Sequence, residues 1–127
     1  MRLLLDTHIA LWALAADRRL GRDARERIAD PDNRVFVSAA SVWEIAIKHA
    51  HGGAVPFSGE DALRFFAEAG YEWLPIRPEH AAAAEGLPRL HNDPFDRLLV
   101  AQALTEPMRL MTHDAALAAY SDTILLV

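Results

Sequence analysis

The chain begins with Met1-Arg2-Leu3-Leu4-Leu5-Asp6-Thr7-His8, a short apolar run that ends in a carboxylate. The three leucines are too few for a helix and predict a strand buried on both faces, whereas the apolar residues after them recur with helical spacing. Asp6 therefore stands at the carboxyl end of a strand, where open α/β sheets bind their ligands. A second interpretation stays open at this point, because Asp6 or Thr7 could simply cap the following helix.

Strand and helix patterns alternate along the rest of the chain. This alternation predicts an α/β fold with a central parallel sheet and helices on both of its faces. Strands are expected at 35–37, 71–76, 109–112 and 123–127. Helices are expected shortly after a turn at Gly21, at 39–50, 59–69, 78–85, from 94 onward, and at 115–120.

Length and composition limit the class of protein. The 127 residues, of which 52% are hydrophobic, predict one domain spanning 1–127 with a sizeable core. The absence of cysteine excludes disulfides and thiolate metal sites, and the net charge of -5 argues against binding nucleic acid through bulk positive charge. No apolar run approaches the length of a membrane span, and Asp6 interrupts what would be a signal segment, so the sequence predicts a cytoplasmic protein without a membrane partner.

Three more acids have positions comparable to that of Asp6. Glu44 is the one acid of an otherwise mostly apolar helix, which is costly unless a cation meets it, although an ordinary i,i+4 pair with Lys48 would also explain it. Asp96 lies in the first turn of the helix that begins at Pro94, where helix capping alone is an alternative explanation. Asp114 stands just after the strand expected at 109–112, as Asp6 stands at the end of the first strand.

These four acids suggest a metal site. Strand ends and helix starts share one edge of a parallel sheet, and carboxylates that converge there repel one another unless a cation holds them. Oxygen ligands select a hard ion, Mg²⁺ or Mn²⁺, and such ions serve phosphate chemistry by activating a water and stabilising the leaving oxygen. Asp93 immediately precedes Pro94 and is best explained as the helix cap, with metal binding as a further possibility.

Four segments contain these acids and their neighbours. They are Leu5-Asp6-Thr7-His8 with Leu11-Trp12, Ser38-Ala39-Ala40-Ser41-Val42-Trp43-Glu44-Ile45, His91-Asn92-Asp93-Pro94-Phe95-Asp96-Arg97-Leu98-Leu99-Val100-Ala101-Gln102-Ala103, and Thr112-His113-Asp114. Together they resemble the PIN-domain proteins, specifically the VapC toxins of bacterial and archaeal toxin–antitoxin pairs, and the third segment is the most specific of the four.

The resemblance implies a PIN-like three-layer fold and a Mg²⁺-dependent endoribonuclease. It further implies that Asp6, Glu44 and Asp96 are the core metal-binding acids and that Asp114 is a fourth, more variable one. The expected partners are an RNA substrate and a cognate VapB-type antitoxin, which would insert a basic side chain among the acids, and the chain is expected to form a homodimer.

Other functions remain as alternatives. A metal-dependent phosphatase would use a strand-end Asp as nucleophile, but it would need a second Asp at the position of His8. A catalytically weak domain that only binds a partner would be missing a core acid, and none is missing. Dinucleotide binding lacks its glycine fingerprint, and zinc hydrolysis lacks a His pair with i,i+4 spacing. Arg97 is a candidate for a phosphate contact or for an ion pair, and the three tryptophans are predicted to lie in the core or in an interface.

Overall fold

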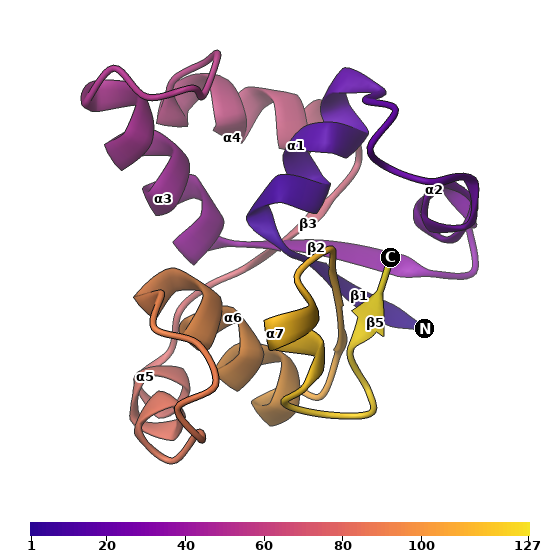
Figure 1. Ribbon diagram of the computed structural model, residues 1–127. Coiled ribbons are helices and arrows are strands. Elements are labelled where there is room, and N and C mark those ends of the chain that lie inside the picture. Colours follow the sequence, from indigo (N-terminus) through magenta and orange to yellow (C-terminus); the bar gives the residue numbers. More distant parts are fainter.

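The computed structural model describes residues 1–127 and contains a five-stranded sheet with seven helices (Figure 1). The strands are β1 (Arg2–Leu5), β2 (Arg34–Ser38), β3 (Glu72–Leu74), β4 (Arg109–Thr112) and β5 (Leu125–Leu126). The helices are α1 (Thr7–Ala15), α2 (Arg22–Ala29), α3 (Ala39–Ala50), α4 (Gly59–Glu68), α5 (Pro78–Glu85), α6 (Pro94–Thr105) and α7 (Ala115–Ala118). The sheet order is β3-β2-β1-β4-β5, and all four pairings are parallel.

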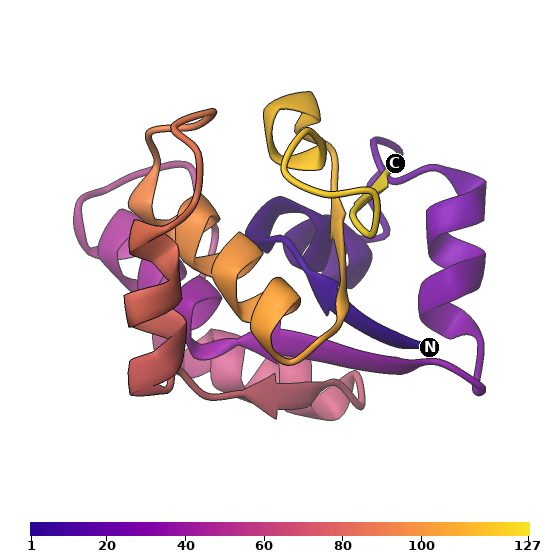
Figure 2. The ribbon, with the colours of Figure 1, turned by 90° about the horizontal axis from the view of Figure 1, so that it is seen from below.

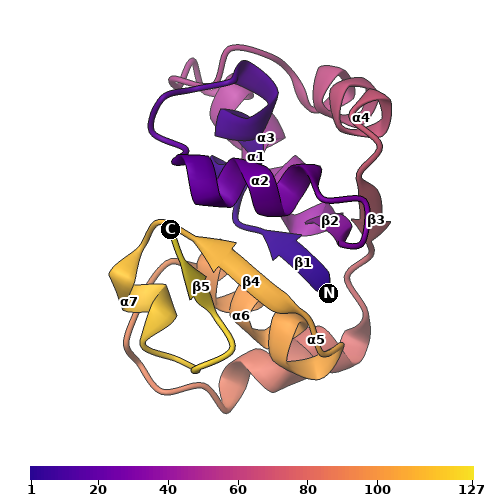
Figure 3. The ribbon, with the colours of Figure 1, turned by 90° about the vertical axis from the view of Figure 1, so that its right-hand side faces the viewer.

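The molecule has three layers, with the sheet in the middle. Helices α1 to α4 lie on one side of the sheet and α5 to α7 on the other (Figure 3), and α5 and α6 run side by side (Figure 2). This arrangement confirms the α/β fold with a central parallel sheet that the strand and helix patterns predict. None of the seven helices has the length and apolar character needed to cross a membrane.

The alternation of side chains along β1 explains why both faces are covered. Leu3 and Leu5 belong to a core cluster with Ile9 of α1 and Phe66 of α4, while Leu4 points to the opposite cluster, which α6 and α7 complete. A strand with successive leucines therefore supplies both cores, because neighbouring side chains of a strand point to opposite faces.

The predicted elements are all present, but two strands and the last helix are shorter than expected. The strand predicted at 71–76 covers only Glu72–Leu74, because Pro75 has no N–H to donate to a neighbouring strand. The strand predicted at 123–127 is reduced to Leu125–Leu126, and the helix predicted at 115–120 ends at Ala118.

A buried chain of polar side chains joins α3 to α6 and α5. Ser38 caps α3 by accepting a hydrogen bond from the Ala40 backbone N–H, and its hydroxyl donates to the Gln102 amide oxygen. Gln102 in turn donates to the Pro75 carbonyl and lies next to His80, whose ring pairs with Glu106. Helix α3, which carries Glu44, is thereby fixed against helix α6, which carries Asp96.

The register of the sheet brings three strand ends to one edge. Leu5 of β1 pairs with Val37 of β2 and with Met111 of β4, so the residues that follow these strands are neighbours. The Asp6 backbone N–H continues this pairing by donating to the Met111 carbonyl at 3.0 Å. Helices that follow parallel strands begin at that same edge, which is the usual ligand-binding edge of such sheets.

Candidate functional site

Asp6 is buried at the carboxyl end of β1, and 4% of the residue is exposed. Its Oδ2 accepts a hydrogen bond of 2.6 Å from the Thr112 hydroxyl, whereas its Oδ1 is buried without any partner. Burial raises the pKa of this carboxyl above its usual value, against the opposing effect of the Thr112 hydrogen bond. Asp6 occupies the N-cap position of α1, yet its side chain makes no capping hydrogen bond, so capping does not explain it.

Glu44 lies on the buried side of α3, and 3% of the residue is exposed. Its Oε1 is 2.8 Å from the Thr7 hydroxyl, which also lies 2.8 Å from the Ser41 hydroxyl. Its Oε2 accepts from Lys48 Nζ at 2.6 Å, and this hydrogen bond raises the pKa of the Lys48 ammonium. The i,i+4 pair considered above therefore exists, and it occurs in a carboxylate that is almost fully removed from water.

Among the acids of the site, Asp96 has the carboxyl whose pKa is shifted most. Its pKa is raised to about 7, first by burial and then by the negative charges of Asp6, Asp93 and Glu44. Its side chain accepts no hydrogen bond from the N-terminal turn of α6, so helix capping does not explain it either. Because those three carboxylates act on Asp96, the acids of α6, β1 and α3 share one electrostatic environment.

Asp93 is the N-cap of α6. Its Oδ1 accepts hydrogen bonds from the backbone N–H groups of Phe95, at 2.8 Å, and Asp96, at 3.1 Å. The predicted capping role of Asp93 is thus confirmed. Whether this side chain also contacts a metal ion stays a prediction.

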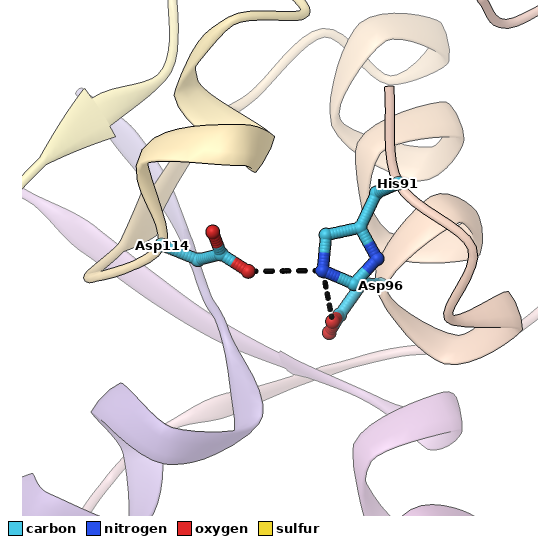
Figure 4. Close-up of side chains that lie close together, drawn as sticks. All are labelled: His91, Asp96 and Asp114. Carbon is cyan, nitrogen blue, oxygen red and sulfur yellow. Dashed lines mark hydrogen bonds and ion pairs between the residues drawn. The ribbon is translucent and has the colours of Figure 1, made fainter. Parts of the chain in front are cut away.

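The ring of His91 lies between the carboxylates of Asp114 and Asp96. Oδ1 of Asp114 caps α7 by accepting from the Ala116 N–H, and Oδ2 of Asp114 lies 3.0 Å from Nε2 of His91. The same nitrogen is 3.5 Å from Oδ2 of Asp96 (Figure 4). One potential ligand atom of each of the three residues, His91, Asp96 and Asp114, lies within 4.8 Å of the others.

The structure thus divides the predicted acids into two adjacent sets. Asp96 and Asp114 gather around His91, while Asp6 and Glu44 lie deeper and outside that 4.8 Å group. His91 was not predicted to have a role, although it stands two residues before the capping Asp93 in the most specific segment of the chain. That position is the only signal in the sequence, because the contact with Asp114 spans 23 residues.

The structure decides between the alternatives for two other residues. Arg97 makes no ion pair; its guanidinium donates to the carbonyls of Ala84 and Pro88 and to the Tyr120 hydroxyl, and its contact with a phosphate stays a prediction. Trp43 is 59% exposed rather than buried in the core, and its ring lies edge-on to Phe95 with 5.2 Å between the centroids. An interface role for Trp43 therefore remains, and a core role does not.

The donor atoms suit a hard divalent cation. Every predicted ligand is a carboxylate, and oxygen ligands are those that Mg²⁺ and Mn²⁺ prefer. The buried, unpartnered Oδ1 of Asp6 is the clearest sign, since a buried carboxylate oxygen without a hydrogen bond is costly unless something positive meets it. The residues present therefore fit a metal ion of this class.

A groove adjoins the acids on the side of α1 and α4. Its volume is about 730 Å³, and it extends along α1 from Thr7 to Ala15. Thr7 and Lys48, which both contact Glu44, belong to the lining of the groove. The rest of the lining is largely apolar and includes Leu11, Trp12, Val55, Phe57 and Phe65.

Comparisons with known proteins agree with this architecture. The family model of the PIN domain matches residues 3–122. Ribonuclease VapC22 of Mycobacterium tuberculosis is 33% identical over 119 residues, which are 92% of this chain and 90% of that protein.

Solved structures of low sequence identity share the fold. A chain of the VapBC2 complex of Rickettsia felis, bound to a DNA fragment from its promoter, superposes with a TM-score of 0.73 at 16% identity, covering 100% of this chain and 98% of that one. A chain of the DNA-bound VapBC complex of Salmonella typhimurium gives 0.68 at 15% identity, with 100% and 97% covered. The sequence match over nearly the whole length and the shared fold lead to one conclusion: the chain belongs to the PIN domain family, and within it to the VapC group.

Proposed function

We propose that this chain is a metal-dependent endoribonuclease that acts as the toxin of a toxin–antitoxin pair. The observation that carries the proposal is the buried Oδ1 of Asp6, which has no partner and belongs to a cluster of carboxylates in which neighbouring negative charges help to raise the pKa of Asp6 and of Asp96. The similarity to Ribonuclease VapC22 supports RNA as the substrate.

In this proposal Asp6, Glu44 and Asp96 hold one Mg²⁺ or Mn²⁺, and Asp114 completes the site. When bound, the ion would supply positive charge to the scissile phosphate and lower the pKa of a coordinated water. No side chain is covalently modified. Asp93 acts chiefly as the cap that fixes the first turn of α6, on which Asp96 lies.

The surrounding residues orient the carboxylates and leave few of their oxygens free. Thr112 holds Oδ2 of Asp6, and Thr7 holds Oε1 of Glu44, so each hydroxyl fixes the rotation of one acid. The Lys48 ammonium lies 2.6 Å from Oε2 of Glu44 and places a positive charge against this buried carboxylate. The preorganised acids need little rearrangement to bind a cation.

The test is cleavage of a labelled structured RNA by the purified chain with Mg²⁺, with Mn²⁺ and with EDTA. We expect cutting with either ion and none with EDTA, because the site then lacks the positive charge that a phosphodiester requires. An assay with a phosphomonoester addresses the phosphatase alternative. Absence of cutting on every RNA tried, together with no calorimetric signal for Mg²⁺ or Mn²⁺, would instead favour a domain that only binds a partner.

We also propose that a VapB-type antitoxin binds this chain by placing an apolar segment in the 730 Å³ groove and a basic side chain among the acids. More than half of the groove's lining residues are hydrophobic, and the lining includes two residues that contact Glu44, so a segment bound in the groove would lie next to the acid site. The VapBC complexes of shared fold support a partner of this class.

Substitution of Ala54, which lines the groove, tests whether the antitoxin binds there. Ala54→Arg adds bulk and positive charge to the lining and is expected to weaken binding of the antitoxin by at least about 10-fold. Ala67→Arg, on the exposed side of α4 and outside the lining, is the matched control. Titration with each VapB-type antitoxin of the source genome measures the effect, and equal affinities for both variants would place the partner elsewhere.

A homodimer and a cytoplasmic location complete the proposal. The exposed Trp43 ring and its neighbour Phe95 offer an apolar surface near the acids, of the kind that subunit interfaces cover. Light scattering on the purified chain measures its mass in solution, and a monomeric mass at high concentration would contradict the dimer.

A further inference from the structure

We propose that His91 is a positioning residue of the acid site: its imidazole donates from Nε2 to Asp114, close to Asp96, and is barred from binding the metal ion itself. The inference rests on the proposed metal site for its functional consequence. Its structural part, the position of the ring proton, is independent of any metal.

The proton position follows from the contact at the other ring nitrogen. Nδ1 of His91 lies 3.0 Å from the backbone nitrogen of Asp93. A backbone N–H only donates, so Nδ1 must offer its lone pair and carries no proton. The proton of the neutral ring is therefore on Nε2, and the backbone of the α6 cap selects this tautomer.

The protonated nitrogen faces the two acids. Nε2 is 3.0 Å from Oδ2 of Asp114 and 3.5 Å from Oδ2 of Asp96, and the three side chains converge in Figure 4. A donor at this point offsets the repulsion between two carboxylates that come from different elements, the start of α7 and the first turn of α6. His91 thus sets the position of Asp114 relative to Asp96 before a cation arrives.

The main chain around His91 is also held in place. The Tyr120 hydroxyl accepts hydrogen bonds from the backbone N–H groups of Leu90 and His91, at 3.2 and 3.1 Å, and from Arg97 at 3.2 Å. Arg97 also donates to two carbonyls of the preceding segment, as described above. The backbone at His91 is therefore fixed, and the ring itself is held by its contacts with the Asp93 N–H and the Asp114 carboxylate.

The same geometry argues against His91 as a ligand. Coordination through Nε2 would require the proton of the neutral ring to move to Nδ1. Nδ1–H would then face the Asp93 N–H across 3.0 Å, which sets two donors against each other. His91 lies among potential ligand atoms, yet its role there is to donate.

The first measurement is the tautomer in the metal-free protein. Long-range ¹H–¹⁵N spectra, with the His91 signals assigned by their loss in His91→Gln, are expected to show a protonated Nε2 and an unprotonated Nδ1. A protonated Nδ1 would overturn the inference whatever the protein does to RNA.

Two amide variants separate the two nitrogens of the ring. In His91→Gln the amide nitrogen of the new side chain reaches about as far as Nε2 and keeps a donor for Asp114, whereas His91→Asn keeps only a group at the position of Nδ1. By calorimetry, we expect the Mn²⁺ affinity of His91→Gln to lie within about 3-fold of that of the wild type. We expect His91→Asn to bind Mn²⁺ about 10-fold more weakly, which is typical when a residue that hydrogen-bonds to a metal ligand is lost. Equal affinities of the Asn variant and the wild type would contradict the positioning role.

Electron spin-echo spectroscopy of the Mn²⁺-loaded protein tests the exclusion from the metal. No coupling from a directly coordinated imidazole nitrogen is expected, and a coupling that disappears in His91→Gln would make His91 a ligand and overturn the inference. If Mn²⁺ binds with the expected pattern but no RNA is cut, the proposed function fails and the inference about His91 stands.

Discussion

Asp6→Asn is expected to lower the rate of metal-dependent RNA cleavage by about 10³-fold, which corresponds to about 4 kcal/mol of lost transition-state stabilisation. The reason is local. Oδ2 of Asp6 is already used by the Thr112 hydroxyl, and Oδ1 is the buried atom left free for a cation. An asparagine that keeps its oxygen toward Thr112 must place an NH₂ group where Oδ1 stood, and an NH₂ group cannot bind a metal ion.

The folded state is not expected to suffer from this change. The pKa of Asp6 is raised mainly by burial, so the charged carboxylate is unfavourable in the metal-free protein and a neutral amide of the same shape relieves that cost. Single-turnover cleavage and thermal unfolding should be measured on the same preparations. Asp32→Asn, an exposed acid in the turn before β2, is the control that should leave cleavage unchanged. A folded Asp6→Asn variant that cuts at the wild-type rate would remove Asp6 from the site.

Asp96→Asn is expected to raise the free energy of unfolding of the metal-free protein by about 2 kcal/mol at pH 8. The pKa of Asp96 is about 7 in the folded chain against a usual value of 3.8. The folded state therefore binds this proton more tightly than the unfolded state, and stability is lost as the pH rises from about 4 to about 7. The full pKa difference would give about 4 kcal/mol, and we expect about half because 19% of the side chain is exposed.

Urea denaturation in EDTA at pH 4.5 and at pH 8 measures this effect. The gain of Asp96→Asn over the wild type should be small at pH 4.5, where the folded Asp96 is protonated, and should reach its full size at pH 8. Asp17→Asn is a contrasting control, because Arg19 lowers the pKa of the half-buried Asp17 to about 2, so its loss should not stabilise the chain at either pH. No difference between Asp96→Asn and wild type at pH 8 would contradict the raised pKa.

Addition of Mg²⁺ should reverse the order of stability. At 100 times its dissociation constant the ion would stabilise the wild type by about 2.7 kcal/mol and should add little to Asp96→Asn, which lacks a ligand. An equal Mg²⁺ effect on both proteins would mean that Asp96 does not hold the ion.

Much of the fold follows from local patterns. The three consecutive leucines after Arg2 predict a doubly covered strand, and Asp93 with Pro94 marks the start of α6 to the residue. The short edge strands were harder to delimit, because β3 and β5 each have a single neighbour and their ends depend on that pairing. Tertiary pairing of this kind leaves no periodicity in the sequence.

The candidate site, too, could be predicted only where local sequence patterns determine it. Asp6 and Asp96 stand out because a carboxylate next to an apolar run or at a helix start is conspicuous in the sequence. The contact of His91 with Asp114, the hydrogen bonds of Arg97 to carbonyls and the exposure of Trp43 depend on segments that meet only in the folded chain. The metal ligands and the single domain over 1–127 stay predictions.

The ion pair between Lys48 and Glu44 has a practical consequence for chemical modification. Lys48 is the only lysine of the chain, and its side chain remains partly exposed while its Nζ contacts the buried carboxylate. Reagents that acylate amines can thus reach only one side chain, at the acid site, together with the terminal amine. Acetylation there would remove the positive charge that partners Glu44 and would alter the electrostatics of the site without any mutation.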